Sequence, residues 1–131
     1  FNDELHTARN VTKTHKSNTK TFQSPNHGPI GVLTKYRLQF HHMPYRQQEL
    51  ENVNDKLNVQ LVKAYMGIPG DIFSFYNREG TDGTVIEALG QGNIPPSAIE
   101  GNQQLESFNI PIVLVSRSFT GIVSPTYPYD G

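Results

Sequence analysis

The sequence predicts an α/β fold, in which residues 56–131 form a three-layer parallel sheet by the order strand, helix, strand, helix, strand. Apolar segments suited to buried strands alternate there with two segments of helical periodicity. Residues 110–115 read IPIVLV and are apolar at every position, as expected of a strand that is covered on both faces. The residues before this region are more polar, and they predict extended strands and loops.

The first part of the chain is polar and rich in turn formers. Residues 7–21 contain one large apolar side chain, Val11, and therefore cannot form a core by themselves. Residues 22–31 include two prolines and two glycines, a density that predicts a compact loop. Residues 32–40 alternate apolar and polar side chains well enough to predict one strand. Residues 44–55 are polar again and indicate a linker between domains.

Five elements are expected after this linker. They cover residues 57–62, 68–78, 84–89, 96–108 and 110–115. The apolar residues of the first strand, all expected to be buried, are Leu57, Val59, Leu61 and Val62. The first helix has apolar residues at positions 72, 73, 75 and 76, and helical spacing places Ile72, Phe75 and Tyr76 on one face. Because the three strands are joined by helices, the sheet should be parallel with right-handed crossovers.

The loop after the second of these strands is the best candidate for a functional site. It reads Gly90, Gln91, Gly92, Asn93 and leads into two prolines that suit the first turn of a helix. Ligands of open α/β sheets bind outside the carboxyl ends of the strands, where Asn93 is expected. A dinucleotide-binding fingerprint needs a third glycine where the chain has Pro95, so that interpretation fails. Taken alone, the loop also fits an ordinary strand-to-helix connection.

Four segments together carry a likeness to a known family. They are NVTKTH at 10–15, FQSPNHGPIG at 22–31, GTVIEALGQGNIPP at 83–96 and IPIVLVSRSFTGIVSP at 110–125. In their order and spacing the chain resembles the bacterial-type L-asparaginase family, nearly from end to end. The resemblance implies that residues 1–35 are the tail of an N-terminal catalytic domain, residues 36–55 an interdomain linker and residues 56–131 most of a C-terminal α/β domain.

The resemblance also implies a function. The whole protein would be an amidohydrolase that converts L-asparagine to L-aspartate and ammonia, without a cofactor, by a threonine nucleophile on the N-terminal domain. No catalytic residue is expected in this chain, which should be inactive alone. Asn93, with Gly90, Gln91 and Gly92, would bind the amino-acid end of a substrate in the active site of a neighbouring subunit of a homodimer or homotetramer. An amide offers both donors and an acceptor for such a role.

Two other classes of function stay open. One is a different amidohydrolase on the same scaffold, acting on glutamine or on a tRNA-linked amide. The other is a small-ligand binding module that performs no reaction. Some members of the family have an acidic residue soon after the third strand, and the candidate for it in this chain is Asp130.

Two hydroxyl-bearing segments are candidate nucleophiles. Thr81 and Asp82 resemble the threonine–aspartate pair of the family, but they precede the second strand, at the wrong end of the sheet, where a glycine-flanked turn explains them. The segment Ser116, Arg117, Ser118 follows the third strand and is better placed. It has no general base nearby in the sequence, and a serine without one is a weak nucleophile.

Composition excludes several further classes. The net charge of −1 and pI near 6.6, with scattered lysines and arginines, argue against a nucleic-acid-binding surface. The chain has no cysteine, so disulfides and thiolate metal sites are excluded. His41 and His42 are neighbours in an extended segment and point to opposite sides, and His6, His15 and His27 are expected to have no acidic partner at a ligand spacing. No metal, membrane span or signal peptide is expected, and a cytoplasmic location is the expectation, although Phe1 is an unusual first residue.

Overall fold

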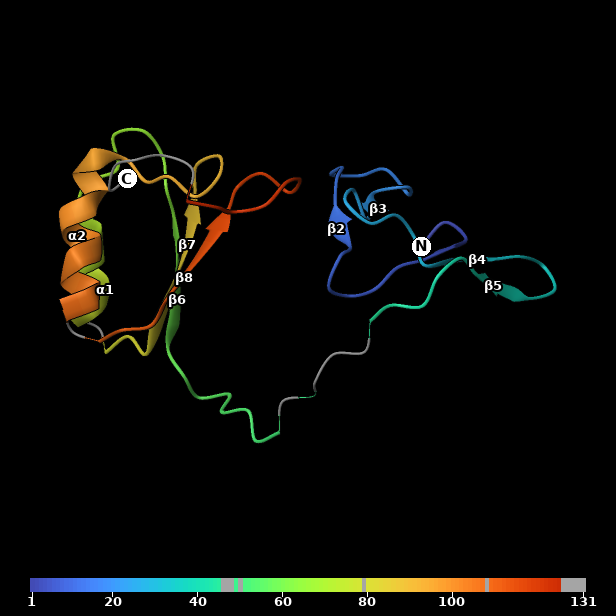
Figure 1. The fold of residues 1–131 in the computed structure, drawn as a ribbon, viewed down its shortest axis with the longest axis horizontal. Coiled ribbons are helices and arrows are strands. Elements are labelled where there is room, and N and C mark those ends of the chain that lie inside the picture. Colours follow the sequence, from blue (N-terminus) through green and yellow to red (C-terminus); the bar gives the residue numbers. More distant parts are fainter. Residues whose placement is uncertain (46–48, 50, 79, 108, 126–131) are drawn as a thin grey trace. The chain divides into compact units, whose positions relative to one another are not determined.

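The computed structural model describes residues 1–45, 49, 51–78, 80–107 and 109–125. The chain forms two compact units, the N-terminal unit (residues 1–51) and the C-terminal unit (residues 52–131), which are described separately (Figure 1). The domain boundaries expected at 35/36 and 55/56 stay predictions.

The N-terminal unit consists of short antiparallel strands joined by turns. One sheet has the order β1-β4-β5, and the other pairs β2 with β3. The strands are β1 (Glu4–Leu5), β2 (Thr12–Lys13), β3 (Phe22–Gln23), β4 (Gly31–Leu33) and β5 (Leu38–Phe40). The extended strands and loops expected here are therefore present, in segments of two or three residues each.

The single strand expected at residues 32–40 is wrong, because the chain reverses in the middle of it. Thr34 caps the reversal: its Oγ1 accepts a hydrogen bond from the Arg37 amide at 3.1 Å and donates one to the Arg37 carbonyl at 2.9 Å. The two halves become β4 and β5 of a hairpin, with Leu33 opposite Leu38. β5 thus lies within the range 36–55 that the sequence indicates as a linker.

The C-terminal unit has the predicted strand–helix–strand–helix–strand order. Its elements are β6 (Val59–Lys63), α1 (Asp71–Arg78), β7 (Gly83–Ala88), α2 (Pro96–Ser107) and β8 (Ile112–Ser116). The strands are parallel, and β7 lies between β6 and β8. The α/β class and the parallel pairing of the three strands are confirmed.

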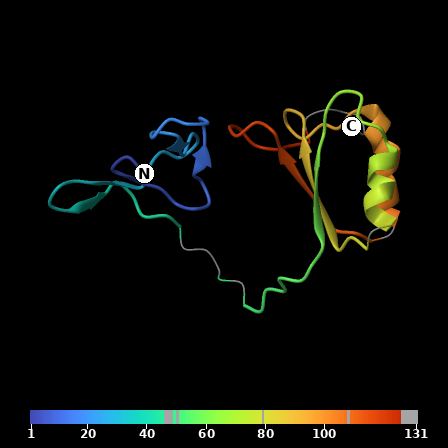
Figure 2. The same ribbon diagram turned by 180° about the vertical axis from the view of Figure 1, so that it is seen from behind.

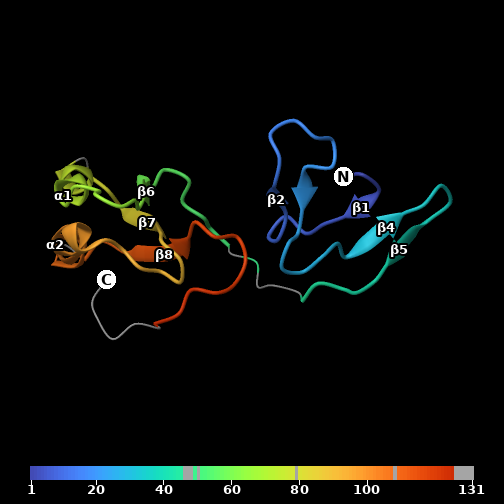
Figure 3. The same cartoon turned by 90° about the horizontal axis from the view of Figure 1, so that it is seen from above.

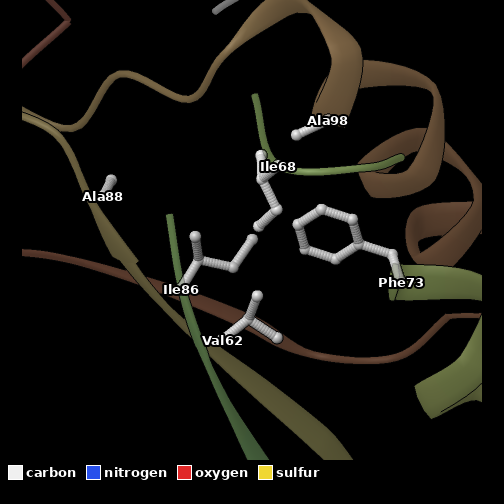
Figure 4. Packing of buried hydrophobic residues seen from close by; sticks show 6 residues of the cluster. All are labelled: Val62, Ile68, Phe73, Ile86, Ala88 and Ala98. Carbon is white, nitrogen blue, oxygen red and sulfur yellow. The ribbon is translucent and has the colours of Figure 1, made fainter. Parts of the chain in front are cut away.

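Both helices cover the same face of this sheet (Figure 3). Crossovers of one hand that always move in one direction, from β6 to β7 to β8, place their helices on one side. The core lies between the helices and the sheet (Figure 4), and its buried members are Val62, Ile68, Phe73, Ile86, Ala88 and Ala98. The helices meet at Gly101, where a Cβ atom would lie 2.7 Å from Cδ2 of Phe73 and would also meet the Gly70 carbonyl. Glycine is therefore needed at this crossing.

The opposite face of the sheet is open, so the described residues form two layers instead of three. Leu61 of β6 is 62% exposed, and Val113 of β8 is 55% exposed. Of the four residues expected to be buried in the first strand, only Val62 is buried, because it alone points toward the helices. The expectation that both faces of residues 110–115 are covered is also wrong for the described part of the chain.

The buried face of α1 differs from the predicted one. Phe73 is fully buried, whereas Phe75 is 57% exposed. Ile72 is half-buried and packs against the core as expected, and the Tyr76 side chain lies outside the described residues. The helix is turned so that Phe73 reaches the sheet and Gly101 of α2.

Candidate functional site

Two loops meet at the carboxyl edge of the parallel sheet. The first, loop 90–93, leaves the end of β7, and the second, segment 116–124, begins at the last residue of β8 (Figures 1 and 2). Ala88 and Ser116 are register partners, so the two strands end at the same level. The sheet ladder continues one step further, since the Arg117 amide donates to the Ala88 carbonyl at 3.0 Å.

Loop 90–93 is a tight turn closed by its own backbone. The Leu89 amide donates to the Asn93 carbonyl at 2.8 Å, and the Leu89 carbonyl accepts from the amides of Gly92 at 3.0 Å and Asn93 at 2.9 Å. Gly90 has φ +49° and Gly92 has φ +124°. The second value is one that residues with a side chain rarely adopt, so the turn requires the glycine.

Segment 116–124 contacts each of the first three residues of this loop. Ser116 Oγ donates a hydrogen bond to the Gly90 carbonyl, and the Ser124 amide donates to the Gln91 carbonyl at 3.1 Å. Gly92 packs against apolar side chains, since a Cβ there would lie 2.9 Å from Cγ1 of Val123 and 3.0 Å from Cδ2 of Leu114. The loop is therefore held from one side as well as by its own turn.

The two loops line a pocket of about 410 Å³ that is open to solvent. This volume is in the range of small-molecule sites. From loop 90–93 the lining includes Gly90 and Gln91, and the remaining lining residues come from the end of β8 and segment 116–124: Leu114, Val115, Ser116, Ser118, Thr120, Gly121, Ile122 and Val123. The polar side chains available to a ligand are thus the amide of Gln91 and the hydroxyls of Ser118 and Thr120, because the Ser116 hydroxyl binds backbone groups.

Asn93 occupies a different position from Gln91. Its residue is half-buried, and it does not belong to the lining of the pocket. Both of its backbone groups are used in the turn. The binding role expected of Asn93 stays a prediction. Gln91, in contrast, lines the pocket.

The sequence assigned no binding role to Ser116, Ser118 or Thr120. The first two are candidates in the sequence only as nucleophiles, and they lack a base for that role. A signal was present, because parallel strands end at one edge of the sheet, so polar residues after β8 must lie near those after β7. The structure brings these hydroxyls together with Gly90 and Gln91.

Thr81 and Asp82 lie at the opposite edge of the sheet, before β7. Asp82 pairs with Asn58, the residue just before β6. The backbone amide of Asn58 donates to Asp82 Oδ2 at 2.7 Å, and the backbone amide of Asp82 donates to the backbone carbonyl of Asn58 at 2.8 Å. Thr81 is buried in the same turn. The expected position of this pair, before β7 at the amino edge of the sheet, is confirmed, and its lack of a catalytic role stays a prediction.

The expectation that His6 has no nearby acidic partner is wrong, because Glu4, two residues earlier in the chain, lies beside it. His6 Nε2 lies 3.4 Å from the Glu4 carboxylate, and His6 Nδ1 lies 2.9 Å from Ser24 Oγ. The His6 side chain is only 3% exposed and Ser24 is 6% exposed, so this cluster is an interior polar network of the N-terminal unit. Across the described residues, no three His, Asp or Glu side chains gather as metal ligands would.

Two further expectations concern other parts of the chain. Asp130 lies outside the described residues. None of the described helices has the length and apolar character that crossing a membrane requires.

Similarity to known proteins extends over both units. The family described as the glutaminase/asparaginase C-terminal domain matches residues 58–131, and the family described as asparaginase, N-terminal, matches residues 1–46. The L-asparaginase of Bacillus licheniformis is 28% identical over the whole chain, which covers 41% of that protein. A probable L-asparaginase of Deinococcus radiodurans is 32% identical, again over the whole chain and 40% of the relative.

A second group of relatives has a different name. A glutamyl-tRNA(Gln) amidotransferase subunit of Pyrococcus horikoshii is 33% identical over 91% of the chain and 28% of the relative. The chain thus spans about two fifths of the asparaginases and less than a third of this amidotransferase subunit. The C-terminal match alone covers more than half of the chain, and it includes both loops of the carboxyl edge. The chain belongs to the glutaminase/asparaginase family.

Proposed function

We propose that the protein, in its full length, is an amidohydrolase that converts L-asparagine to L-aspartate and ammonia. Loop 90–93 and segment 116–124 bind the amino-acid end of the substrate. The supporting observation is the pocket at the carboxyl edge of the sheet, which pairs a rigid turn with an amide side chain and several hydroxyls. Family membership supplies the reaction class.

The chemistry of this pocket suits recognition better than bond cleavage. Gln91 presents a carbonyl oxygen that accepts from an ammonium group and an NH₂ that donates to a carboxylate. Contacts of this kind to charged groups are stronger than those between neutral groups. Neither Ser116 nor Ser118 has a histidine at the pocket to act as a base, since the pocket lining contains none.

The reaction itself belongs to another part of the protein in this proposal. A threonine of the N-terminal domain, outside the present residues, attacks the side-chain amide, releases ammonia and forms an acyl-enzyme that water hydrolyses. The 131-residue chain alone is therefore inactive. Its pocket completes the active site of a neighbouring subunit, so the full-length protein works as a homodimer or homotetramer.

The binding role is tested by paired substitutions in the full-length protein. We expect Gln91→Ala to raise KM for asparagine by about tenfold or more, because the variant loses one hydrogen bond to a charged group of the substrate. Asn93→Ala should raise KM by a smaller factor. The matched control is Gln103→Ala, which removes an exposed glutamine of α2 away from the pocket. Unchanged KM in both loop variants would refute the binding role, and ammonia release by the 131-residue chain alone would refute the location of the nucleophile.

A second candidate function has support from the relatives. Several archaeal proteins named as a subunit of glutamyl-tRNA(Gln) amidotransferase align with more than nine tenths of the chain. In that case the protein would release ammonia from an amide for use on a charged tRNA. Rates of ammonia release from free asparagine and free glutamine, with and without glutamyl-tRNA, separate the two: stimulation by the tRNA favours the second function.

A further inference from the structure

We infer that Ser116 is a positioning residue of the substrate-binding pocket: its hydroxyl holds loop 90–93 in the geometry that binds substrate. This inference rests on the proposed function of that loop. It concerns a residue that touches the loop backbone and acts on the ligand through it.

Ser116 has a defined place in the parallel sheet. It is the last residue of β8, opposite Ala88 at the end of β7, and it belongs to the one parallel ladder that joins these two strands. The residue is half-buried. A hydroxyl at this position is attached to backbone that the pairing of β7 with β8 holds in place.

The Ser116 hydroxyl contacts two backbone groups. Ser116 Oγ donates to the Gly90 carbonyl, 26 residues earlier in the chain, and accepts from the Ser118 amide at 3.0 Å. One side chain thus joins the first residue of loop 90–93 to the first turn of segment 116–124. Both of its capacities, as donor and as acceptor, are used by backbone groups.

Loop 90–93 needs such an anchor. Gly90 and Gln91 are exposed, and a glycine restricts its own backbone less than other residues do. The hydrogen bonds of the turn tie Leu89 to Gly92 and Asn93, but they leave the carbonyl groups of Gly90 and Gln91 outside the turn. Those two carbonyls are the ones that Ser116 and the Ser124 amide bind. Gln91 follows Gly90 directly, so the direction of its side chain depends on this anchor.

The test uses three variants of the full-length protein. Ser116→Ala removes the anchor, and Ser116→Thr keeps a hydroxyl on a residue that favours strands. Ser97→Ala is the matched control, because Ser97 Oγ also donates to a backbone carbonyl, that of Ile68, at 2.7 Å, but on the helix side of the sheet. Two quantities are measured: KM and kcat for amide hydrolysis, and the exchange rates of the Gly92 and Asn93 amides.

We expect Ser116→Ala to raise KM about fivefold, the factor that a typical hydrogen bond contributes, with kcat nearly unchanged. A change confined to KM indicates that binding was weakened and chemistry was not. The Gly92 and Asn93 amides should exchange several-fold faster, since the turn opens more often. Ser116→Thr should restore both quantities, and Ser97→Ala should alter neither.

Two results overturn the inference: wild-type KM and wild-type exchange in Ser116→Ala, or the same changes in Ser97→Ala, which would indicate general destabilisation. The proposed function fails separately, if the full-length protein hydrolyses no amide. The exchange rates then decide the role of Ser116 by themselves, because faster exchange in Ser116→Ala alone supports the anchor and unchanged exchange refutes it.

Discussion

Each of the two units is stabilised internally by a different kind of interaction. The C-terminal unit has an apolar core in which two helices pack on one face of a parallel sheet. Among the described residues of the N-terminal unit, Ile30 is the one large apolar side chain that is buried. The other buried side chains of this unit include Thr21 and Ser24. Hydroxyl and imidazole groups that bind backbone atoms supplement the small amount of apolar packing there, which includes the stacked rings of Phe1 and Phe22.

The difference shows how composition decides the means of stabilisation. Residues 7–21 contain too few apolar side chains to bury, so their backbone is fixed by local polar contacts and strands stay two residues long. Residues 57–116 contain enough apolar residues to cover one face of a sheet, and longer elements follow. Three substitutions, ordered by expected effect, test this comparison.

The largest effect should come from Phe73→Ala in the C-terminal unit. The side chain is fully buried between β6, β7 and α2, so its removal should cost about 3–5 kcal/mol and unfold a core of this size. Phe75→Ala on the same helix is the control, with a smaller expected loss because its side chain is 57% exposed. Denaturant unfolding followed by circular dichroism measures both. Equal losses of unfolding free energy in the two variants would contradict the burial of Phe73 in preference to Phe75.

An intermediate effect should come from Thr21→Val in the N-terminal unit. Thr21 is 6% exposed, and its hydroxyl accepts from the His15 amide at 2.8 Å and donates to the His15 carbonyl. Valine has nearly the same shape but leaves these groups unpaired, which should cost about 1–2 kcal/mol. Hydrogen exchange of the amides in residues 12–23 measures the loss.

Thr34→Val is the matched control for that change. Thr34 makes the same pair of bonds, to Arg37, but it is exposed, and water can replace its hydroxyl. We expect a loss below about 0.5 kcal/mol. If Thr34→Val were as costly as Thr21→Val, burial would not be what gives the polar contacts of this unit their weight.

The smallest effect should come from Lys63→Gln on the open face of the sheet. Lys63 Nζ lies 3.3 Å from Glu87 Oε1, and the lysine side chain is 65% exposed. A surface ion pair of this kind contributes little, so the free energy of unfolding should change by less than about 0.5 kcal/mol. Denaturant unfolding at low and high salt provides the measurement. A loss above about 1 kcal/mol would show that polar contacts also sustain the C-terminal unit.

The sequence predicted the order of elements in the C-terminal unit and the place of loop 90–93 for good physical reasons. An unbroken apolar run such as residues 110–115 has few alternatives to a strand, and strands joined by helices must lie parallel. The carboxyl edge then follows from the direction of the strands. Glycine at positions 90 and 92 is a local requirement of the turn, and local requirements are visible in a sequence.

The errors have a common origin in contacts between distant residues. Apolar residues at 72, 73, 75 and 76 surround most of a helix, and only the position of α2 made Phe73 the buried one. The burial of β6 on one face depends on which side both crossovers take. Pairing of β4 with β5 requires a turn at Thr34, but the apolar–polar alternation of residues 32–40 continues through this turn and therefore does not indicate it.

By itself, then, the sequence determined the class of the fold, the parallel direction of the strands and the turn that follows β7, since each arises from neighbouring residues. The tertiary structure alone decided which face of each element is buried and which hydroxyl meets loop 90–93. Ser116 and Gly90 are 26 residues apart, and only the parallel pairing of β7 and β8 brings a side chain at the end of one strand to the backbone that leaves the other.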